Sequence, residues 1–160
     1  MTNPENTSIV LASSQRDFDN AKMLFAEYAS AIDFEAGFKD FQAELAFLET
    51  RYTAPNGCLL LAYKGNAAVG CIAVVSLQPG IAELKRFYVQ PHFQQFKIGA
   101  KLLETAIINA RHLNFNYLRL EVIPTLTKAK ALYASFGFSQ IEPYQPIELE
   151  GTAYMEKKLL

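Results

Sequence analysis

Apolar and polar residues follow two different rhythms along the chain. In seven short segments the apolar residues alternate with polar ones or run together, as they do in β-strands. In four other segments apolar residues recur every three or four positions, which is the spacing of one helical face. The expected order is therefore β-α-α-β-β-β-α-β-α-β-β, with strands at residues 8–12, 58–63, 67–77, 83–90, 117–123, 139–141 and 153–159.

Two of the expected helices precede the second strand. Ser13, Ser14 and Asp17 are candidates to cap the first helix. Residues 33–37 break it, and a second amphipathic helix is predicted from the spacing of Phe41, Leu45 and Leu48. The strands at 58–63 and 67–77 are apolar at nearly every position, so we expect both to be buried on both faces, with helices covering the sheet.

The stretch from Glu83 to Leu103 joins a strand to a helix through a short polar loop. Pro91 stops the strand, the loop covers residues 92–97, and from Gly99 the apolar residues fall on one helical face. The start of such a helix presents unpaired backbone N–H groups and the positive end of the helix dipole. This arrangement favours binding of a phosphate or pyrophosphate, although the glycine patterns of the Walker and Rossmann loops are absent.

Two motifs in this part of the chain resemble those of one family. Residues 94–99, Q-x-x-K-x-G after a strand ending in Tyr88-Val89, are similar to the Q/R-x-x-G-x-G/A acyl-CoA motif of the GNAT family of N-acetyltransferases. Residues 129–138 resemble the family's A-x-x-L-Y-x-x-x-G-F helix. The resemblance covers residues 57–141 and implies an α/β (α+β) fold. That fold is a mixed sheet of about seven strands flanked by helices, splayed between the fourth and fifth strands.

The resemblance also implies that acetyl-CoA binds mainly to backbone groups. The N–H groups of Phe87, Tyr88 and Val89 would hold the thioester carbonyl and the pantetheine, with the Gln94 side chain alongside the pyrophosphate. The pyrophosphate itself would lie on the backbone of the loop and the first helical turn, at Gln95, Phe96, Lys97, Ile98, Gly99 and Ala100.

Lys97 and Leu126 depart from the family's pattern. Lys97 stands where the family most often has its first glycine. It is either an added cation beside the pyrophosphate or an exposed loop lysine in a turn that needs no positive φ. Leu126 stands where many relatives have an asparagine, so the contact of that asparagine with the pantetheine is in question.

Tyr133 is the candidate proton donor. It matches the tyrosine that in many relatives gives its proton to the departing CoA thiolate, and a phenol is a workable acid for a thiolate. The helix pattern alone favours a core aromatic whose hydroxyl lies at the rim, and the two motifs together favour the proton donor.

Glu83 and Glu121 are the candidate bases. Glu83 lies in an A-E-L run that resembles the A-E-[IL] run carrying the general base in the histone-acetylating branch of the family. On a regular strand its side chain would share a face with Phe87 and Val89, and a bulge would break that alternation. The alternative role for both glutamates is an ion pair with a neighbouring cation, and many relatives use only a water chain. For Glu83 the candidate cations are Lys85, Arg86 and Arg119.

The acetyl acceptor would be bound by the variable segments, residues 33–41 and 144–154. Both segments combine carboxylates with aromatic residues, which suits a cationic amine with an apolar body. The predicted activity is direct transfer of an acetyl group from acetyl-CoA to a primary amine of a small molecule or a lysine. The alternative is a non-catalytic module that binds and senses acyl-CoA. The residues expected to contact the acceptor are Phe34, Glu35, Glu121 and Tyr144.

Composition sets limits on this picture. The chain has 160 residues, 51% hydrophobic and 19% charged, enough for one domain over residues 1–160 without metals or disulfides. A net charge of −1 argues against general nucleic-acid binding. We find no signal-peptide pattern and no apolar run of the ~18 residues that a membrane span needs, so we expect a cytoplasmic protein without a membrane partner.

The cysteines and histidines do not suggest a metal or a disulfide. Cys58 and Cys71 lie in strand-like runs and fit a reducing compartment as small buried hydrophobes. His92 and His112 have no cysteine or acidic residue at ligand spacing, so no metal is expected. Edge strands near the C-terminus leave the choice between monomer and homodimer open.

Overall fold

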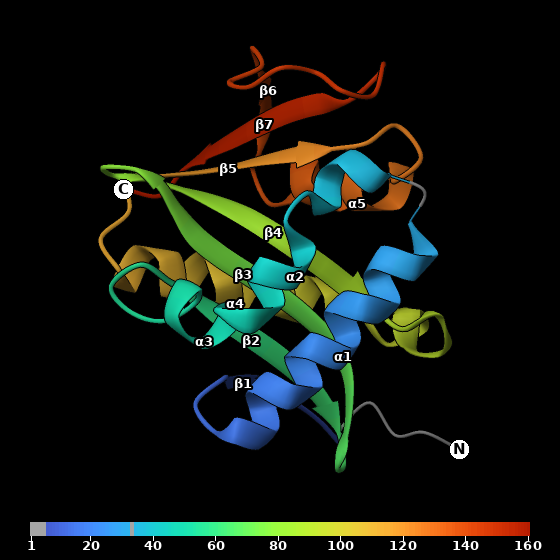
Figure 1. Ribbon diagram of the computed structural model, residues 1–160. Helices are drawn as coiled ribbons and strands as arrows, with labels where there is room; N and C mark the ends of the chain where they lie inside the picture. The colour runs from blue at the N-terminus through green and yellow to red at the C-terminus, as the bar shows by residue number, and fades with distance from the viewer. Residues whose placement is uncertain (1–5, 33) are drawn as a thin grey trace.

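The computed structural model describes residues 6–32 and 34–160 of the chain. Seven strands form one mixed sheet with helices on both faces, as predicted (Figure 1). The strands are β1 Thr7–Leu11, β2 Gly57–Lys64, β3 Ala67–Gln78, β4 Ile81–Val89, β5 Tyr117–Val122, β6 Ser139–Ile141 and β7 Ala153–Lys158. Their order across the sheet is β1-β2-β3-β4-β5-β7-β6.

The helices follow the predicted order, with one correction. Ser14 caps α1 and forms a capping box with Asp17. Both residues are among the predicted cap candidates. The single helix predicted from Phe41 to Leu48 is wrong, because two short helices with a break at Phe47 occupy that segment. The predicted apolar residues Phe41, Leu45 and Leu48 do pack on the core, but the most buried residue of α2 is Glu44. The helices are α1 Gln15–Ala31, α2 Phe41–Ala46, α3 Leu48–Arg51, α4 Ile98–His112 and α5 Thr127–Ser135, with 3-10 turns η2 Glu35–Phe38 and η3 Pro91–Phe96.

The sheet is buried on both faces by two separate hydrophobic clusters. Alternate residues of β2 divide between them: Leu60 packs with α4, and Leu59 and Leu61 pack with α1 and α3. Tyr133 and Phe138 bring α5 and the turn after it onto the α4 face. The prediction that β2 and β3 are buried on both sides is therefore confirmed.

The sheet opens between β4 and β5. These parallel strands pair only at Ile81–Tyr117, Ala82–Leu118 and Glu83–Arg119. Beyond these pairs β4 continues to Val89 and β5 to Val122 without pairing to each other, so the two strands diverge. This is the splay that the family resemblance implied and that periodicity alone cannot predict.

A bulge interrupts β4 at Arg86. Its φ of 56° lies in the left-handed region, and two residues, Arg86 and Phe87, stand opposite the single residue Ile72 of β3. After the bulge the alternation is reversed, because Leu84 and Phe87 both pack on the α4 face. Glu83 therefore does not share a face with Phe87, as it would on a regular strand.

Three observations bear on the expectations from composition. Cys58 and Cys71 are free and buried, and burial raises the pKa of the Cys58 thiol to about 12. In residues 6–32 and 34–160 no helix is long and apolar enough to cross a membrane. The same ranges contain no group of three His, Cys, Asp or Glu side chains arranged to hold a metal ion.

Candidate active site

Three neighbouring spaces, which share some of their lining residues, lie where β4 and β5 diverge. A cleft of about 670 Å³, here called the front cleft, lies between the α2–α3 segment and the loop before β7. A groove of about 440 Å³, here called the α4–α5 groove, lies between the end of β4 and the starts of α4 and α5. A narrow passage of about 70 Å³ shares Glu83 and Glu121 with the front cleft and Tyr28 and Leu126 with the groove.

The α4–α5 groove gathers half of the residues predicted to bind acetyl-CoA. Phe87, Tyr88, Val89, Gln94 and Gly99 line it. The Gln94 amide donates to the carbonyl of Val89 at 3.0 Å, which fixes the η3 segment against the end of β4. Lys97, Ile98 and Ala100 are not among the described residues that line the groove, and the side chains of Gln95 and Phe96 fall outside the described part of the chain.

Lys97 begins α4 in a left-handed conformation, with φ 57° and ψ 23°. The expectation of a loop lysine in a turn without positive φ is therefore wrong, and a glycine at this position would adopt the same backbone without strain. The bond from the Lys101 N–H to the Lys97 carbonyl is at 3.3 Å. The N–H groups of the first helical turn come before this first hydrogen bond of the helix. They have no carbonyl partner within the helix, which favours an anion at this end of α4.

Gly99 lets α4 lie directly on the end of β4. A Cβ atom at position 99 would be 3.3 Å from the ring of Phe87 and 3.8 Å from the side chain of Leu132. Both of these side chains line the groove, so any larger residue at position 99 would narrow it. The shape of the groove and the chemistry of its helix start fit a pantetheine and pyrophosphate.

Tyr133 lies behind the groove rather than in it. Its ring is 5.9 Å from that of Phe87 and 5.8 Å from that of Phe138, and only 6% of the residue is exposed. Burial raises its pKa, and so does the nearby Tyr28, so the phenol is held protonated. Among the described residues that line the three spaces, Tyr133 is not one.

Tyr28 of α1 is a phenol that neither of the two family-like motifs includes. It lines both the passage and the α4–α5 groove, and burial raises its pKa to about 12. Its ring contacts those of Phe38 and Tyr88 at 5.7 and 5.5 Å. Helical spacing gives no signal for this role, because a tyrosine on a buried face looks like any core aromatic.

Glu83 and Glu121 lie together at the passage. The hydroxyl of Tyr144 donates to Glu83 Oε2 at 2.8 Å. Glu121 Oε2 accepts from Gln145 at 3.0 Å and from the Tyr154 hydroxyl at 3.3 Å. Within the described ranges neither glutamate forms an ion pair, so the cross-strand salt bridges weighed for them are not found.

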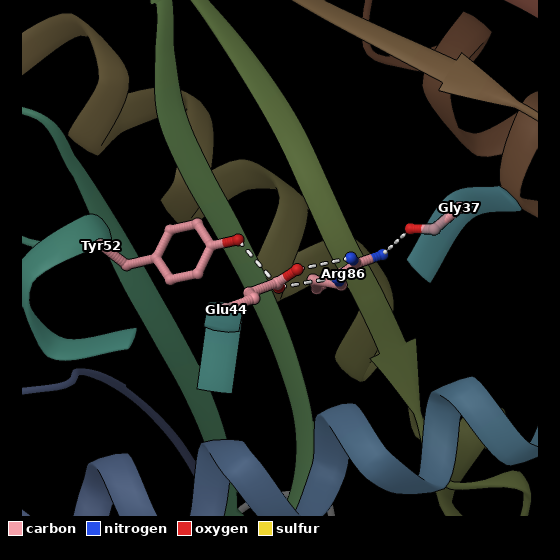
Figure 2. Close-up of polar contacts among 4 residues, drawn as sticks. All are labelled: Gly37, Glu44, Tyr52 and Arg86. Atoms are coloured by element: carbon pink, nitrogen blue, oxygen red, sulfur yellow. Dashed lines mark hydrogen bonds and ion pairs between the residues drawn. The ribbon is translucent and has the colours of Figure 1, made fainter. Parts of the chain in front are cut away.

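A buried polar network joins the bulge to the α2 segment (Figure 2). The Arg86 guanidinium donates to both oxygens of Glu44 at 2.7 and 2.9 Å, and to the Gly37 carbonyl at 3.0 Å. The Tyr52 hydroxyl donates to Glu44 at 3.0 Å from the other side. Burial raises the pKa of Glu44, but the hydrogen bonds and charge of Arg86 outweigh it and hold that pKa below its usual value.

The two segments predicted to bind the acceptor form walls of the front cleft. Phe34 and Gly37 line one side, and Gln145, Pro146 and Glu148 line the other. Lys39 and Glu148 form an ion pair between the two walls. Of the predicted acceptor residues, Phe34 and Glu121 line the cleft. Tyr144 is not one of its described lining residues, but its hydroxyl donates a hydrogen bond to Glu83, which is. The side chain of Glu35, together with all of Asp33, falls outside the described part of the chain.

Known proteins resemble the chain over most of its length. The profile of the acetyltransferase (GNAT) family matches residues 21–138. An uncharacterised N-acetyltransferase of Schizosaccharomyces pombe is 34% identical over 161 residues, which cover 99% of each chain. A GNAT-family acetyltransferase of Staphylococcus aureus superimposes with a TM-score of 0.78 at 21% identity, covering 96% of this chain and 99% of that one.

A second solved structure includes the acetyl donor. It is an acetyltransferase of Salmonella typhimurium described with its cofactor acetyl-CoA, with a TM-score of 0.67 at 15% identity, covering 96% of this chain and 94% of that one. At these identities the two structures support the fold alone.

Proposed function

The chain belongs to the acetyltransferase (GNAT) family, and on that premise we propose that it moves an acetyl group from acetyl-CoA to a primary amine. The donor lies in the α4–α5 groove and the amine enters through the front cleft. The observation that supports this proposal is the passage, because it shares Glu83 and Glu121 with the front cleft and Tyr28 and Leu126 with the groove. The proposal assigns residues 1–160 to one acetyltransferase domain.

Acetyl-CoA supplies a thioester whose carbonyl carbon accepts the amine nitrogen while the C–S bond breaks. The chain orients the thioester with the backbone of β4 beyond the bulge, where Phe87 to Val89 have no partner on β5. The first turn of α4 holds the phosphates on its free N–H groups. Leu126 lines the groove where many relatives have asparagine, so this chain offers an apolar surface in place of an amide contact.

Two protons move in this reaction. The amine loses one, and the carboxylate of Glu83 or Glu121 accepts it at the passage, directly or through a water. The leaving thiolate gains the other from a phenol, either Tyr133 or Tyr28, and the proton that the nitrogen loses after the C–N bond forms restores that phenol. Among the described residues the hydrogen bonds of both glutamates use Oε2, so each Oε1 is available to the acceptor.

The test combines binding with turnover. Acetyl-CoA and CoA should each raise the melting temperature, because ~100 Kd of ligand adds about 2.7 kcal/mol to stability. Release of free thiol with a panel of primary amines should then identify transfer. In Gly99→Asp both signals should disappear, since the carboxylate would repel the pyrophosphate and crowd Phe87. Stabilisation without turnover of any amine would favour a sensing module, and absence of stabilisation would contradict the proposal.

A further inference from the structure

The charged residues of the front cleft fall into those already paired and those left over. Arg86 is paired with Glu44 and Lys39 with Glu148, so these four charges are balanced inside the protein. Five charged lining residues remain: Glu83, Glu121 and Lys85, which also line the passage, and Arg51 and Asp40, which line the cleft only. In the ranges that the structure describes, none of these five takes part in an ion pair.

Lys85 is a partly buried cation of the front cleft, and its pKa is lowered. It lines both the front cleft and the passage. Burial lowers its pKa, and so do the charges of Arg86 and Arg51, with only partial compensation from Glu83 and Glu44. A partly buried ammonium beside two guanidinium groups is stabilised by an anion. No carboxylate of the described chain is within ion-pair distance of it.

Glu83 and Glu121, in contrast, are stabilised by a cation. Each is fixed through Oε2 by side chains of the last third of the chain, and each keeps Oε1 for a ligand. The Tyr144 hydroxyl and the Gln145 amide are neutral donors, so they orient the carboxylates without neutralising them. The passage therefore holds negative charge that a protonated amine can balance.

The distance between the carboxylates and the cations of the cleft fits a small molecule that carries one positive and one negative group. Glu83 and Lys85 are two residues apart on β4, before the bulge, so their side chains leave the same face about 6–7 Å apart. Hydrogen bonds of about 2.8 Å from each side leave room for an ammonium and a carboxylate on neighbouring atoms.

Resting on the proposed function, we propose that the acceptor is an amine that also carries a carboxylate next to it, as an amino acid does. Its amine lies between Glu83 and Glu121, facing the passage, and its carboxylate lies on Lys85 and Arg51. The side chain of the acceptor extends into the rest of the front cleft, where Phe34 and Phe47 offer apolar surface. The volume of about 670 Å³ is of the size that holds a small molecule.

Matched acceptor sets test this inference. Each set consists of an amino acid, its carboxamide and its decarboxylated amine, for example phenylalanine, phenylalaninamide and phenethylamine. The full-length protein should acetylate the amino acid with a kcat/KM at least ~10-fold above that for the decarboxylated amine, which corresponds to about 1.4 kcal/mol. Lys85→Met should remove most of this preference by lowering turnover of the amino acid only. Lys85→Glu should reverse it.

The comparison of variants cancels differences in the intrinsic reactivity of the amines, because the same compounds are used with every protein. Lys158→Met is the matched control, since Lys158 is exposed at the end of β7 and lines none of the three spaces. Retained acetylation of phenethylamine by Lys85→Met shows that the variant folds. If that variant is inactive towards every compound, Arg51→Met, at an exposed position, makes the same test.

Two failures are distinguishable. An unchanged preference in Lys85→Met and Arg51→Met, or a wild-type protein that prefers the decarboxylated amines, overturns the zwitterion and leaves acetyl transfer standing. Absence of turnover with every member of every set, despite stabilisation by CoA, refutes acetyl transfer itself and this inference with it.

Discussion

The guanidinium of Arg86 donates two hydrogen bonds, of 2.7 and 2.9 Å, to the carboxylate of Glu44, which lies 42 residues earlier in the chain. Arg86 is the left-handed residue of the β4 bulge, and Glu44 is the buried residue of α2. Phe38 stacks on the guanidinium at 4.1 Å. This pair therefore fixes the bulge and the α2 wall of the front cleft relative to each other.

Breaking this pair should destabilise the protein. In Glu44→Gln the guanidinium of Arg86 is left buried without a counter-charge, and we expect unfolding to become easier by about 3–5 kcal/mol at pH 7. The folded-state pKa of Glu44 is lowered, so its stabilising contribution is present above the usual pKa of a glutamate and is lost as pH falls through the lowered value. Urea unfolding at pH 7 and in steps below pH 4.5 measures both effects.

The control for that prediction is Glu49→Gln, at an exposed position of α3. It should change the free energy of unfolding by no more than about 0.5 kcal/mol. A Glu44→Gln variant as stable as this control, or a difference from wild type that persists unchanged at low pH, would show that the pair does not hold the segment.

Lys97→Gly should stabilise the chain. Lys97 has φ 57°, where a side chain costs about 1–2 kcal/mol and glycine avoids that strain. Glycine also loses more conformational freedom on folding, about 0.5–1 kcal/mol, so the expected net gain is up to about 1 kcal/mol. Lys97→Ala keeps the strain and should give no gain. Thermal unfolding compares the two variants with wild type.

The same pair of variants tests the charge of Lys97. If the backbone N–H groups of α4 hold the pyrophosphate, both variants should keep the affinity for CoA within a few-fold. A much weaker affinity in both would identify the Lys97 ammonium as a phosphate contact instead.

Tyr133→Phe should lower kcat and leave the affinity for CoA within a few-fold. The ring contacts with Phe87 and Phe138 remain in this variant, and only the proton donor is removed. General acid catalysis is typically worth ~10²–10⁴-fold, which sets the expected range of the loss. Tyr28→Phe is the informative comparison, because Tyr28 lines the passage. An unchanged kcat in Tyr133→Phe together with a lowered kcat in Tyr28→Phe transfers the role to Tyr28.

Local patterns predicted the elements of this fold well. Alternating and continuous apolar runs predicted all seven strands. Residue type alone identified Ser14 and Asp17 as cap candidates of α1. The motif at residues 94–99 predicted the strand–turn–helix that lines the α4–α5 groove. These features are encoded by neighbours within a few positions, so one sequence is enough to find them.

Long-range pairings explain what the sequence did not predict. The break at Phe47 and the bulge at Arg86 both accompany the ion pair between Glu44 and Arg86, whose partners are 42 residues apart. A strand pattern assumes regular alternation, so it cannot show that Phe87 faces away from Glu83. The signal that was present is an arginine directly before the aromatic and apolar residues that end the strand, and an arginine that is buried there needs an acidic partner. Its partner could not be identified without the structure.

The last prediction concerns the proton acceptor, and it starts from the contact of Tyr144 with Glu83. Burial and the charge of Glu83 raise the pKa of Tyr144, so its hydroxyl stays protonated and donates to Glu83 across the usual assay range. In the proposed function the other oxygen of Glu83 takes the proton of the acceptor amine. A lysine-type amine has a pKa near ~10.4, so at neutral pH nearly all of it is protonated and must lose a proton before it attacks.

Glu83→Gln keeps the size of the side chain and can still accept from Tyr144, but it cannot take that proton. We therefore expect kcat/KM to fall at neutral pH and to recover partly towards pH 10, where the amine loses its proton unaided. Measurement of kcat/KM from about pH 6 to pH 10, with urea unfolding alongside, separates this loss from a loss of stability. Glu121→Gln is the matched variant on β5. A pH profile of Glu83→Gln that superimposes on that of wild type would remove Glu83 from the mechanism, and a changed profile in Glu121→Gln would then assign the proton to the second carboxylate. Because both glutamates are held by neutral donors in the same passage, the shape of the two profiles decides between them where distance alone does not.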